Sequence, residues 1–185
     1  RRFGQPCVGV DSSGNYHICA TPGGAGVYYA KFNSTGSNLV PLKNVSSIAV
    51  DPWNPALAVG PDDRVQIVYE DSSSGADQVV IVDSRLDNDG NINKDGIRFS
   101  WFGWNCTSPT ICTDDQNRVH AAFIKTDEGV FHGVLDFSNE PYLKETTYLY
   151  NLPSYPDKGP PSICCDPTRN VWVLWNDDPQ NGGTL

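Results

Sequence analysis

The sequence predicts an all-β protein built from one repeated unit, and two observations support this prediction. Helix-forming composition is lacking: the 185 residues include 17 Gly and 14 Pro but no Met, and only 19% are charged. Gly and Pro disfavour helices and favour turns. In addition, four segments align without a gap over sixteen positions, at residues 6–21, 55–70, 109–124 and 161–176. A repeat with a period of about 50 residues therefore organises the chain.

Each repeat is expected to contain four strands. In the second repeat, a short apolar segment follows Pro55, a polar turn covers 60–64, and a β-branched and aromatic strand covers 65–69. A third strand at 79–82, a turn at 87–91 and a more variable fourth strand complete the unit. A proline at the head of each first strand is acceptable, because the first residue of a strand need not donate to the sheet.

The strands are expected to be buried on both faces. Val65, Ile67 and Tyr69 lie on one face of the second strand, and Val68 lies on the other. A sheet with one face in water would alternate apolar and polar residues instead. The first strands share a column of small residues, as crowding near a central axis requires: Gly9, Ala58, Cys112 and Cys164. Four-stranded units of this length, buried on both faces and narrowing inward, are the blades of a β-propeller.

The length corresponds to about three and a half blades. We expect the end of a preceding blade at 1–5, three blades at 6–54, 55–108 and 109–160, and the first half of a fourth at 161–185. A two-stranded edge would expose backbone groups and apolar side chains such as Trp172 and Trp175. The chain is therefore expected to be part of a larger ring, completed by missing blades or by a second chain. A self-contained four-bladed ring would need strands that the sequence does not offer.

The repeat motif P-x-[IVL]-[small]-x-D-x-x-[GN], followed in the first repeat by GVYYA at 26–30, resembles a known group. It is similar to the sialidase-like and lectin-like propeller repeats of secreted proteins, which often have six or seven blades. The resemblance implies blade architecture and leaves activity open. The sialidase Asp-box S-x-D-x-G-x-x-W is not present in that form, because Asp11, Asp114 and Asp166 lie between the first and second strands.

Charge and cysteine content bear on partners and location. The net charge of −9 argues against the basic surface needed for nucleic acid or for an anionic membrane surface. No apolar run approaches the roughly 18 residues of a membrane span. Six cysteines and three N-x-[ST] sequons favour an extracellular or cell-surface protein. Glycosylation is accordingly expected at Asn33, Asn44 and Asn105.

No catalytic constellation is recognisable. Arg64, Arg118 and Arg169 occupy equivalent positions in or beside turns, and equivalent positions around a ring cannot converge on one carboxylate. His17 and His120 share a column that holds Gln66 and Trp172 elsewhere, and we interpret both histidines as structural. We therefore expect a module that binds glycans or a protein partner. The alternatives are a fragment of a sialidase-like glycoside hydrolase, with its catalytic residues in missing blades, and a purely structural module of a surface or matrix assembly.

Two groups of residues are candidates for ligand and metal binding. Trp53, Trp101 and Trp104 lie near the connections between blades, where aromatic faces can stack on a sugar ring. Asp87, Asp89, Asn91 and Asp95 place oxygens at positions 1, 3, 5 and 9 of one loop, which is one pattern of a Ca²⁺ site. The alternative is a plain Asp-Gly hairpin turn. No other cofactor is expected.

The cysteines suggest specific disulfides. If the first turn centres on Ser13, Cys7 and Cys19 face each other on neighbouring strands at a separation that a disulfide can span. Cys106 and Cys112 flank a short connection between blades, and a disulfide across that loop is the second predicted pair. Cys164 and Cys165 are adjacent and point to opposite faces, which favours free thiols or a link to a missing blade or partner chain. Alternatively, all six are buried small hydrophobes.

Overall fold

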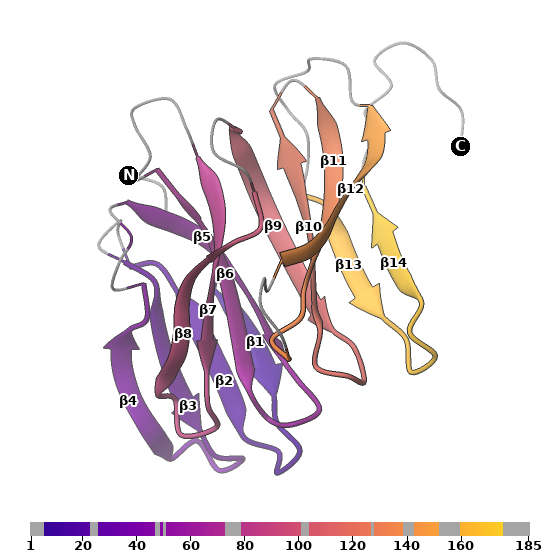
Figure 1. Ribbon diagram of the computed structural model, residues 1–185. Helices are drawn as coiled ribbons and strands as arrows, with labels where there is room; N and C mark the ends of the chain where they lie inside the picture. Colours follow the sequence, from indigo (N-terminus) through magenta and orange to yellow (C-terminus); the bar gives the residue numbers. More distant parts are fainter. Residues whose placement is uncertain are drawn as a thin grey trace.

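A computed structural model of the protein describes residues 6–22, 26–46, 49, 51–72, 79–100, 104–126, 128–138, 143–151 and 160–175 (Figure 1). Every regular element in these ranges is a β-strand, and no helix there is long and apolar enough to cross a membrane. The strands are β1 (Cys7–Val10), β2 (Tyr16–Ala20), β3 (Tyr28–Phe32), β4 (Asn38–Asn44), β5 (Pro52–Val59), β6 (Val65–Asp71), β7 (Val80–Leu86), β8 (Ile92–Arg98), β9 (Cys106–Thr113), β10 (Val119–Lys125), β11 (Gly129–Leu135), β12 (Leu143–Asn151), β13 (Ser162–Cys165) and β14 (Val171–Leu174).

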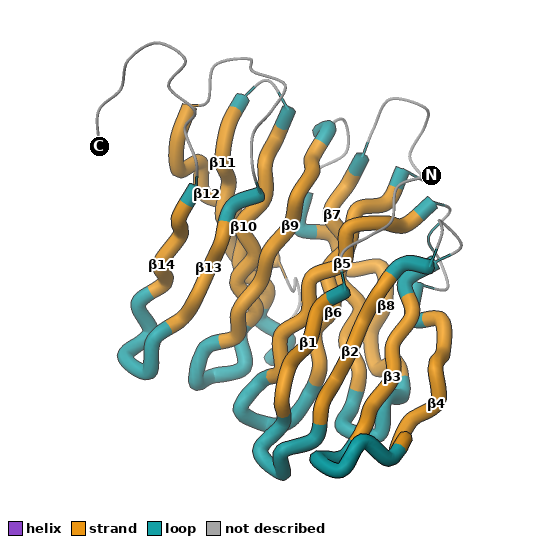
Figure 2. The backbone as a smooth tube through the Cα atoms, turned by 180° about the vertical axis from the view of Figure 1, so that it is seen from behind, coloured by secondary structure: helices purple, strands orange, loops and turns teal. Residues whose placement is uncertain are grey.

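The strands form sheets in chain order, as predicted. Strands β1–β4, β5–β8 and β9–β12 each make a four-stranded antiparallel sheet, here called blades 1, 2 and 3, and β13 pairs with β14 in blade 4. Neighbouring blades touch through their first strands, β1 with β5, β5 with β9 and β9 with β13. Figures 1 and 2 show the blades following one another as separate sheets along the chain. The predicted fold of about three and a half blades is confirmed.

The core is divided between the blade interfaces. One buried cluster joins blades 1 and 2 and contains Tyr29, Val65, Ile67 and Tyr69. A second joins blades 2 and 3 and contains Val68 with residues of blade 3 such as Phe123. Strand β6 is thus buried on both faces, as its apolar pattern predicts. Each fully buried large side chain contributes roughly 1.5–3 kcal/mol, so the interfaces hold the blades together.

The column of small residues reflects close approach of the first strands. A Cβ atom on Gly9 would lie 2.7 Å from the side chains of both Leu57 and Val59. In the same column, Cys112 forms a disulfide with Cys165 of blade 4, with their Cα atoms 6.0 Å apart. The predicted Cys106–Cys112 bond is therefore wrong. Both of these cysteines lie in strand β9, and six residues of extended chain, at roughly 3.3 Å each, hold them too far apart.

The other cysteine predictions have mixed outcomes. Cys7 and Cys19 are directly paired across β1 and β2, which confirms the predicted register, but no disulfide joins them in the structure. Cys165 is bonded within the chain, so its expected link to a missing blade or partner is wrong. Its neighbour Cys164 is exposed and carries no disulfide.

Pro55 and Pro109 do not head their strands as expected. Strand β5 already begins at Pro52, and β9 begins at Cys106. The pairing of β5 with β6 shifts register between Trp53 and Ala56. The pairing of β9 with β10 shifts register where the segment between Ala122 and Ile124 of β10 faces β9. Asn54 and Ser108, which precede the two prolines, have φ angles of 45° and 57°. These bulges accommodate a proline inside a strand, and they move the starts of blades 2 and 3 about three residues earlier.

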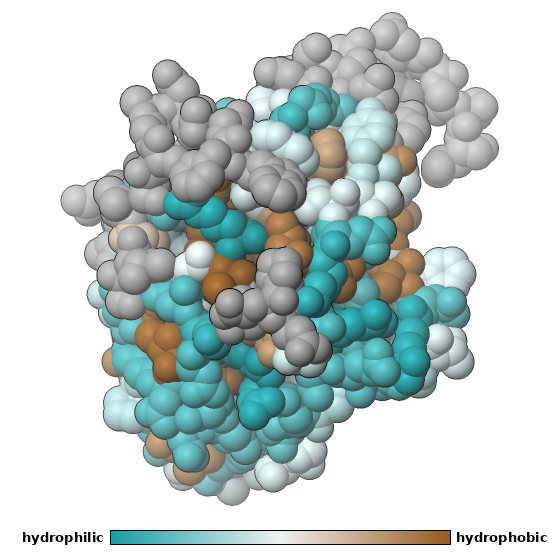
Figure 3. Space-filling view, in the orientation of Figure 1, coloured by the Kyte–Doolittle hydropathy of each residue, from teal (hydrophilic) through white to brown (hydrophobic). Residues whose placement is uncertain are grey.

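The turns between first and second strands form contacts from blade to blade. Ser12 donates from its backbone nitrogen to Asp63 at 2.8 Å. The Asp62 nitrogen donates to Asn117 at 3.2 Å, and Arg169 donates to Asp115 at 2.8 Å. These contacts tie blade 1 to 2, 2 to 3 and 3 to 4 along one face of the molecule. In Figure 3 this face, at the lower edge, is mostly hydrophilic.

Candidate functional site

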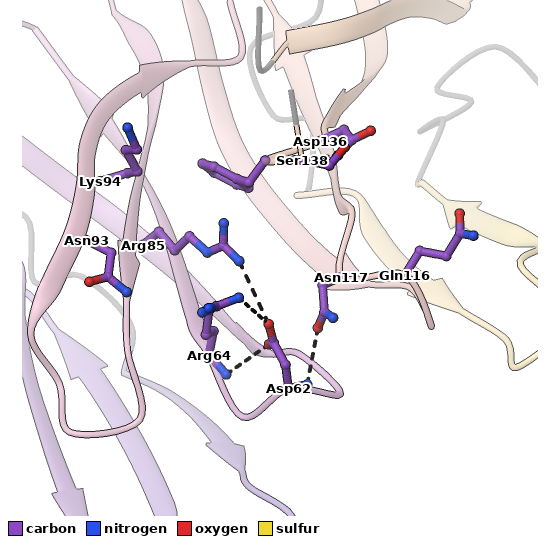
Figure 4. A pocket seen from close by; sticks show the side chains of 10 residues that line it. Asp62, Arg64, Arg85, Asn93, Lys94, Gln116, Asn117, Asp136 and Ser138 are labelled. Carbon is purple, nitrogen blue, oxygen red and sulfur yellow. Dashed lines mark hydrogen bonds and ion pairs between the residues drawn. The ribbon is translucent and has the colours of Figure 1, made fainter. Parts of the chain in front are cut away.

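A polar cavity of about 420 Å³ lies between blades 2 and 3 at the face that carries these turns. Figure 4 shows its lining side chains, which come from three turns and from strands β7 and β8. They are Asp62, Arg64, Arg85, Asn93, Lys94, Gln116, Asn117, Asp136, Phe137 and Ser138. The volume falls within the range of small-molecule sites.

The cavity lies where the repeat loses its turn aspartate. In blades 1, 3 and 4 the first turn begins with Asp11, Asp114 or Asp166, whose carboxylate accepts hydrogen bonds from backbone nitrogens two and four residues ahead. Blade 2 has Gly60 at this position. A Cβ there would lie 2.7 Å from the Asn117 side-chain oxygen. Gly60 therefore lets the turn of blade 3 come close enough for Asn117 to reach Asp62.

Asp62 takes the place of the missing aspartate and holds the two arginines of the cavity. Its carboxylate accepts from the Arg64 backbone nitrogen at 3.1 Å and from the Arg64 guanidinium at 2.7 Å. The Arg85 guanidinium lies 3.8 Å from the same carboxylate, and a dashed line in Figure 4 marks this ion pair. The side chain of Arg64 is about half exposed, whereas only 12% of that of Arg85 is exposed. Of the two arginines of the cavity, Arg85 is therefore the less solvated.

Arg85 occupies the position that Lys31 has in blade 1, but it has different neighbours. Lys31 lies 3.0 Å from Asp11 and donates to the backbone oxygen of Asn88 in blade 2 at 3.0 Å. Arg85 meets Phe137 where Lys31 meets Asn88, and its guanidinium carbon lies 4.4 Å from the ring centroid. A guanidinium stacked on an aromatic face gains cation–π energy. Asp62 and Phe137 thus fix Arg85 at the wall of the cavity.

A buried carboxylate lies behind this wall. Asp83 is two residues before Arg85 on the same face of β7 and is fully buried. Within the described part of the chain, neither of its carboxylate oxygens has a hydrogen-bond partner. Burial raises the pKa of Asp83 well above its usual range, and the positive charge of Arg85 only partly opposes this. A protonated Asp83 does not cancel the charge that Arg85 presents to the cavity.

Comparisons with known proteins agree on the fold. No family model matches the sequence, and neither does any curated protein sequence. Among solved structures, the K499G mutant of NanB sialidase from Streptococcus pneumoniae is similar to the chain with a TM-score of 0.61 at 14% identity, over 90% of this chain and 26% of that one. The Hadza microbial sialidase Hz136 gives 0.58 at 10% identity, over 95% and 44%. The endo-arabinase of Bacteroides thetaiotaomicron gives 0.59 at 14% identity, over 97% and 72%. The fold is that of a β-propeller. The chain spans less than half the length of the two sialidases.

Two of the predicted aromatic ligand residues, Trp53 and Trp104, do not line this cavity. The Trp53 indole donates to the fully buried carboxylate of Glu70. Trp104 packs on Phe131 with ring centroids 5.0 Å apart, and the Lys125 ammonium lies 4.3 Å from its ring centroid. Trp101 lies outside the described residues. Trp53 therefore has a hydrogen-bond partner and Trp104 a packing partner within the blades.

The four predicted calcium ligands do not converge as one set. Asp87 accepts from the backbone and side chain of Asn91 at 2.7 and 3.0 Å, as in a plain turn closed by Gly90 with φ of 76°. Asp95 instead accepts from Tyr69 at 3.2 Å and from Ser84. Among the described residues, no group of three or more His, Cys, Asp or Glu side chains is placed to hold a metal ion. The hairpin-turn alternative fits the geometry, with Asp89 exposed at its tip.

The histidines make hydrogen bonds inside their own blades, which fits the structural role predicted for them. His17 is fully buried between the Tyr29 hydroxyl at 2.8 Å and Asp11 at 3.2 Å. His120 lies 3.1 Å from His132 and 3.4 Å from Asp114. Burial lowers the pKa of His132 to about 4, with a smaller contribution from His120.

The three repeated arginines, Arg64, Arg118 and Arg169, do not converge on one site. Arg118 pairs with Asp114 of its own turn, and Arg169 pairs with Asp115 of the neighbouring blade. Of these three repeated arginines, Arg64 alone lines the cavity. The sequence pattern did not single out Arg85, Asn117 or Phe137. The loss of the turn aspartate at Gly60 was the available indication that the interface between blades 2 and 3 differs from the others.

Proposed function

We propose that this chain is a saccharide-binding propeller module and that the cavity between blades 2 and 3 holds one sugar unit. The observation that carries the proposal is the convergence of side-chain amides, guanidinium groups and carboxylates on one cavity of about 420 Å³. Planar polar groups of these kinds match the paired hydroxyls of a sugar ring. Phe137 adds an aromatic surface beside them. The similar structures include sialidases and an endo-arabinase, which supports a carbohydrate-related role.

The charges of the cavity favour a sugar with an acidic substituent. Arg64, Arg85 and Lys94 contribute three cations, while Asp62 and Asp136 contribute two carboxylates. Asp62 is paired with Arg64, and Asp136 accepts from the backbone and hydroxyl of Ser138. Guanidinium groups pair with carboxylate or sulfate groups in two-point geometry. With both cavity carboxylates occupied in this way, we propose binding without hydrolysis rather than a glycosidase centre.

Location and assembly complete the proposal. The Cys112–Cys165 disulfide supports an extracellular or cell-surface protein, since such bonds persist in oxidising compartments. We propose that further blades, from a longer polypeptide or from a second chain, complete the ring. No nucleic-acid partner and no membrane insertion are proposed.

A binding experiment tests the function. The purified chain is screened on a glycan array, and hits are measured by calorimetry as free saccharides, with a hexuronate compared against its neutral hexose. We expect the acidic sugar to bind and Arg85→Gln to weaken binding at least about tenfold, the effect of roughly 1.4 kcal/mol. Arg169→Gln is the matched control, because Arg169 pairs with Asp115 outside the cavity. Equal losses in both variants, or release of a fluorophore from a fluorogenic glycoside, would contradict the proposal.

A further inference from the structure

Cys7 and Cys19 form a cross-strand pair in which only one thiol is accessible. The two residues are directly opposed in strands β1 and β2. Cys19 is fully buried, whereas Cys7 is half-buried. Cys7 also lines a second cavity, of about 400 Å³, beside the first strands of blades 1 to 3. A small molecule in that cavity can therefore reach Cys7 first.

The other blades show that packing does not require sulfur at these positions. The equivalent cross-strand pairs are Ala56 with Val68, Thr110 with Ala122, and Ser162 with Leu174. Small or aliphatic residues fill the same place in each of them. In blade 1 both positions hold cysteine, which points to a joint chemical role of the two thiols.

The surroundings of the pair favour a thiolate at Cys7. A hydrogen bond from the Cys19 thiol lowers the pKa of Cys7 to about 7, although burial acts in the opposite direction. The same interaction raises the pKa of Cys19. When protonated, the Cys7 thiol donates to the Pro55 carbonyl oxygen at 3.0 Å. By contrast, burial raises the pKa of Cys106 to about 12, which leaves that thiol protonated and unreactive.

We propose that Cys7 and Cys19 are a thiol–disulfide exchange site for low-molecular-weight disulfides, with Cys7 as the attacking and Cys19 as the resolving residue. The Cys7 thiolate attacks one sulfur of the small disulfide, so that a mixed disulfide forms and one small thiolate leaves. Cys19 then loses its proton to that thiolate and attacks the Cys7 sulfur, and the second small thiolate leaves. The two protein thiols are oxidised to one disulfide, and the small disulfide is reduced to two thiols.

The geometry permits the second step without a rearrangement of the blade. Directly opposed residues of antiparallel strands have Cα atoms roughly 4.5–5.5 Å apart, within the range of a disulfide. The bond formed would link β1 to β2 at the wall of the second cavity. This inference extends the register predicted from sequence and is independent of sugar binding in the first cavity.

Mass spectrometry with oxidised glutathione tests the proposal on the 185-residue chain. The background variant is Cys164→Ser, which removes the exposed thiol. We expect the Cys7–Cys19 peptide to form at pH 7 while the Cys112–Cys165 peptide persists. In the Cys19→Val variant the reaction should stop at a glutathione adduct on Cys7. In the Cys7→Ala variant Cys19 should remain unmodified. These replacements copy the blade 2 residues Val68 and Ala56, and circular dichroism checks folding.

Several outcomes would overturn the proposal. An adduct on Cys19 in Cys7→Ala would refute the order of the two steps, and a bond from Cys7 to any other cysteine would refute the pair. If a variant fails to fold, alkylation of the unsubstituted chain decides. Cys7 should react with iodoacetamide at least about tenfold faster than the buried Cys106 at neutral pH, as its larger thiolate fraction requires. Equal rates would contradict the assignment of Cys7 as the attacking thiol.

Discussion

Glu70 of blade 2 accepts a hydrogen bond from the backbone nitrogen of Ser108 in blade 3, at 2.7 Å across 38 residues of sequence. The same carboxylate accepts from the Asn54 side chain at 2.8 Å and from the Trp53 indole. Asn54 and Ser108 are the left-handed residues of the two bulges. One fully buried carboxylate therefore holds the bulges of two neighbouring first strands.

Removing this carboxylate should destabilise the chain strongly. Glu70→Ala leaves three half-buried donors without their acceptor, and an unsatisfied group costs about 1–3 kcal/mol when it is fully buried and less when water can reach it. We expect the urea midpoint to fall accordingly, with Glu70→Gln intermediate because it keeps one acceptor oxygen. Asp89→Asn, at an exposed turn tip, is the control and should change little. A Glu70→Ala variant as stable as the control would show that the contacts of Glu70 contribute nothing.

The disulfide between blades 3 and 4 should contribute measurably to stability. Cys165→Ser opens a loop closed over a sequence separation of 53 residues, and such bonds typically contribute 2–4 kcal/mol. We expect a lower thermal midpoint for Cys165→Ser and an unchanged one for Cys164→Ser. Non-reducing peptide mapping checks the pairing itself, and a Cys106–Cys112 peptide would contradict it.

Asp83 should make the chain less stable as the pH rises. Because burial raises its pKa above the ordinary value of 3.8, the folded state binds more protons than the unfolded state above about pH 4. Stability is then lost with rising pH, by up to about 1.4 kcal/mol per pH unit, until the folded-state pKa is passed. Asp83→Asn should remove this slope. Urea titrations at pH 4, 5, 6 and 7 measure it, and parallel curves for the two proteins would argue against a protonated Asp83.

The exposed apolar side chains on blades 1 and 4, the first and last blades of the chain, should make the isolated chain self-associate. Trp172 is 63% exposed, whereas His17, Gln66 and His120 in the same column are at most 4% exposed. Leu174 is 75% exposed at the same end, and Val8 is 63% exposed at the other. We expect concentration-dependent association in light scattering, reduced by Trp172→Gln with Leu174→Thr. Leu39→Gln, on the outer strand β4, is the control; a strictly monomeric chain at high concentration would count against ring completion.

Glycosylation offers a test of the compartment. Asn33 is half-buried in the turn between β3 and β4, where its side-chain oxygen accepts from Thr35 and Ser37, and Asn44 is exposed at the end of β4. Protein from a eukaryotic secretory host should therefore carry glycans at Asn33 and Asn44. Asn105 precedes β9 and its side-chain oxygen is buried, unlike that of Asn33, so its occupancy should be lower. Peptide mapping after glycosidase treatment reports each site, and unmodified Asn33 and Asn44 would contradict the extracellular assignment.

The repeat made the blades predictable, because burial of both faces of β6 and the column of small residues follow from patterns within single strands. The register of Cys7 with Cys19 followed from one turn. The Cys112–Cys165 bond could not be predicted from the sequence, because it depends on how blades 3 and 4 pack against each other. Nor could the pattern reveal the cavity between blades 2 and 3. That site arises from a glycine at position 60 and from side chains of two blades, spread from Asp62 to Ser138 in the chain, which only the stacking of the blades brings together.

The contacts between successive turns also affect the order in which the blades unfold. Ser12 to Asp63, Asp62 to Asn117 and Asp115 to Arg169 link each blade to its sequence neighbour. In such a linear array, each unit relies on the units beside it, so opening begins at an end and proceeds inward. Blade 2 lies between two complete blades, and β6 is buried throughout its length. Its amide hydrogens should therefore exchange last, and β6 should be the final strand to lose its structure.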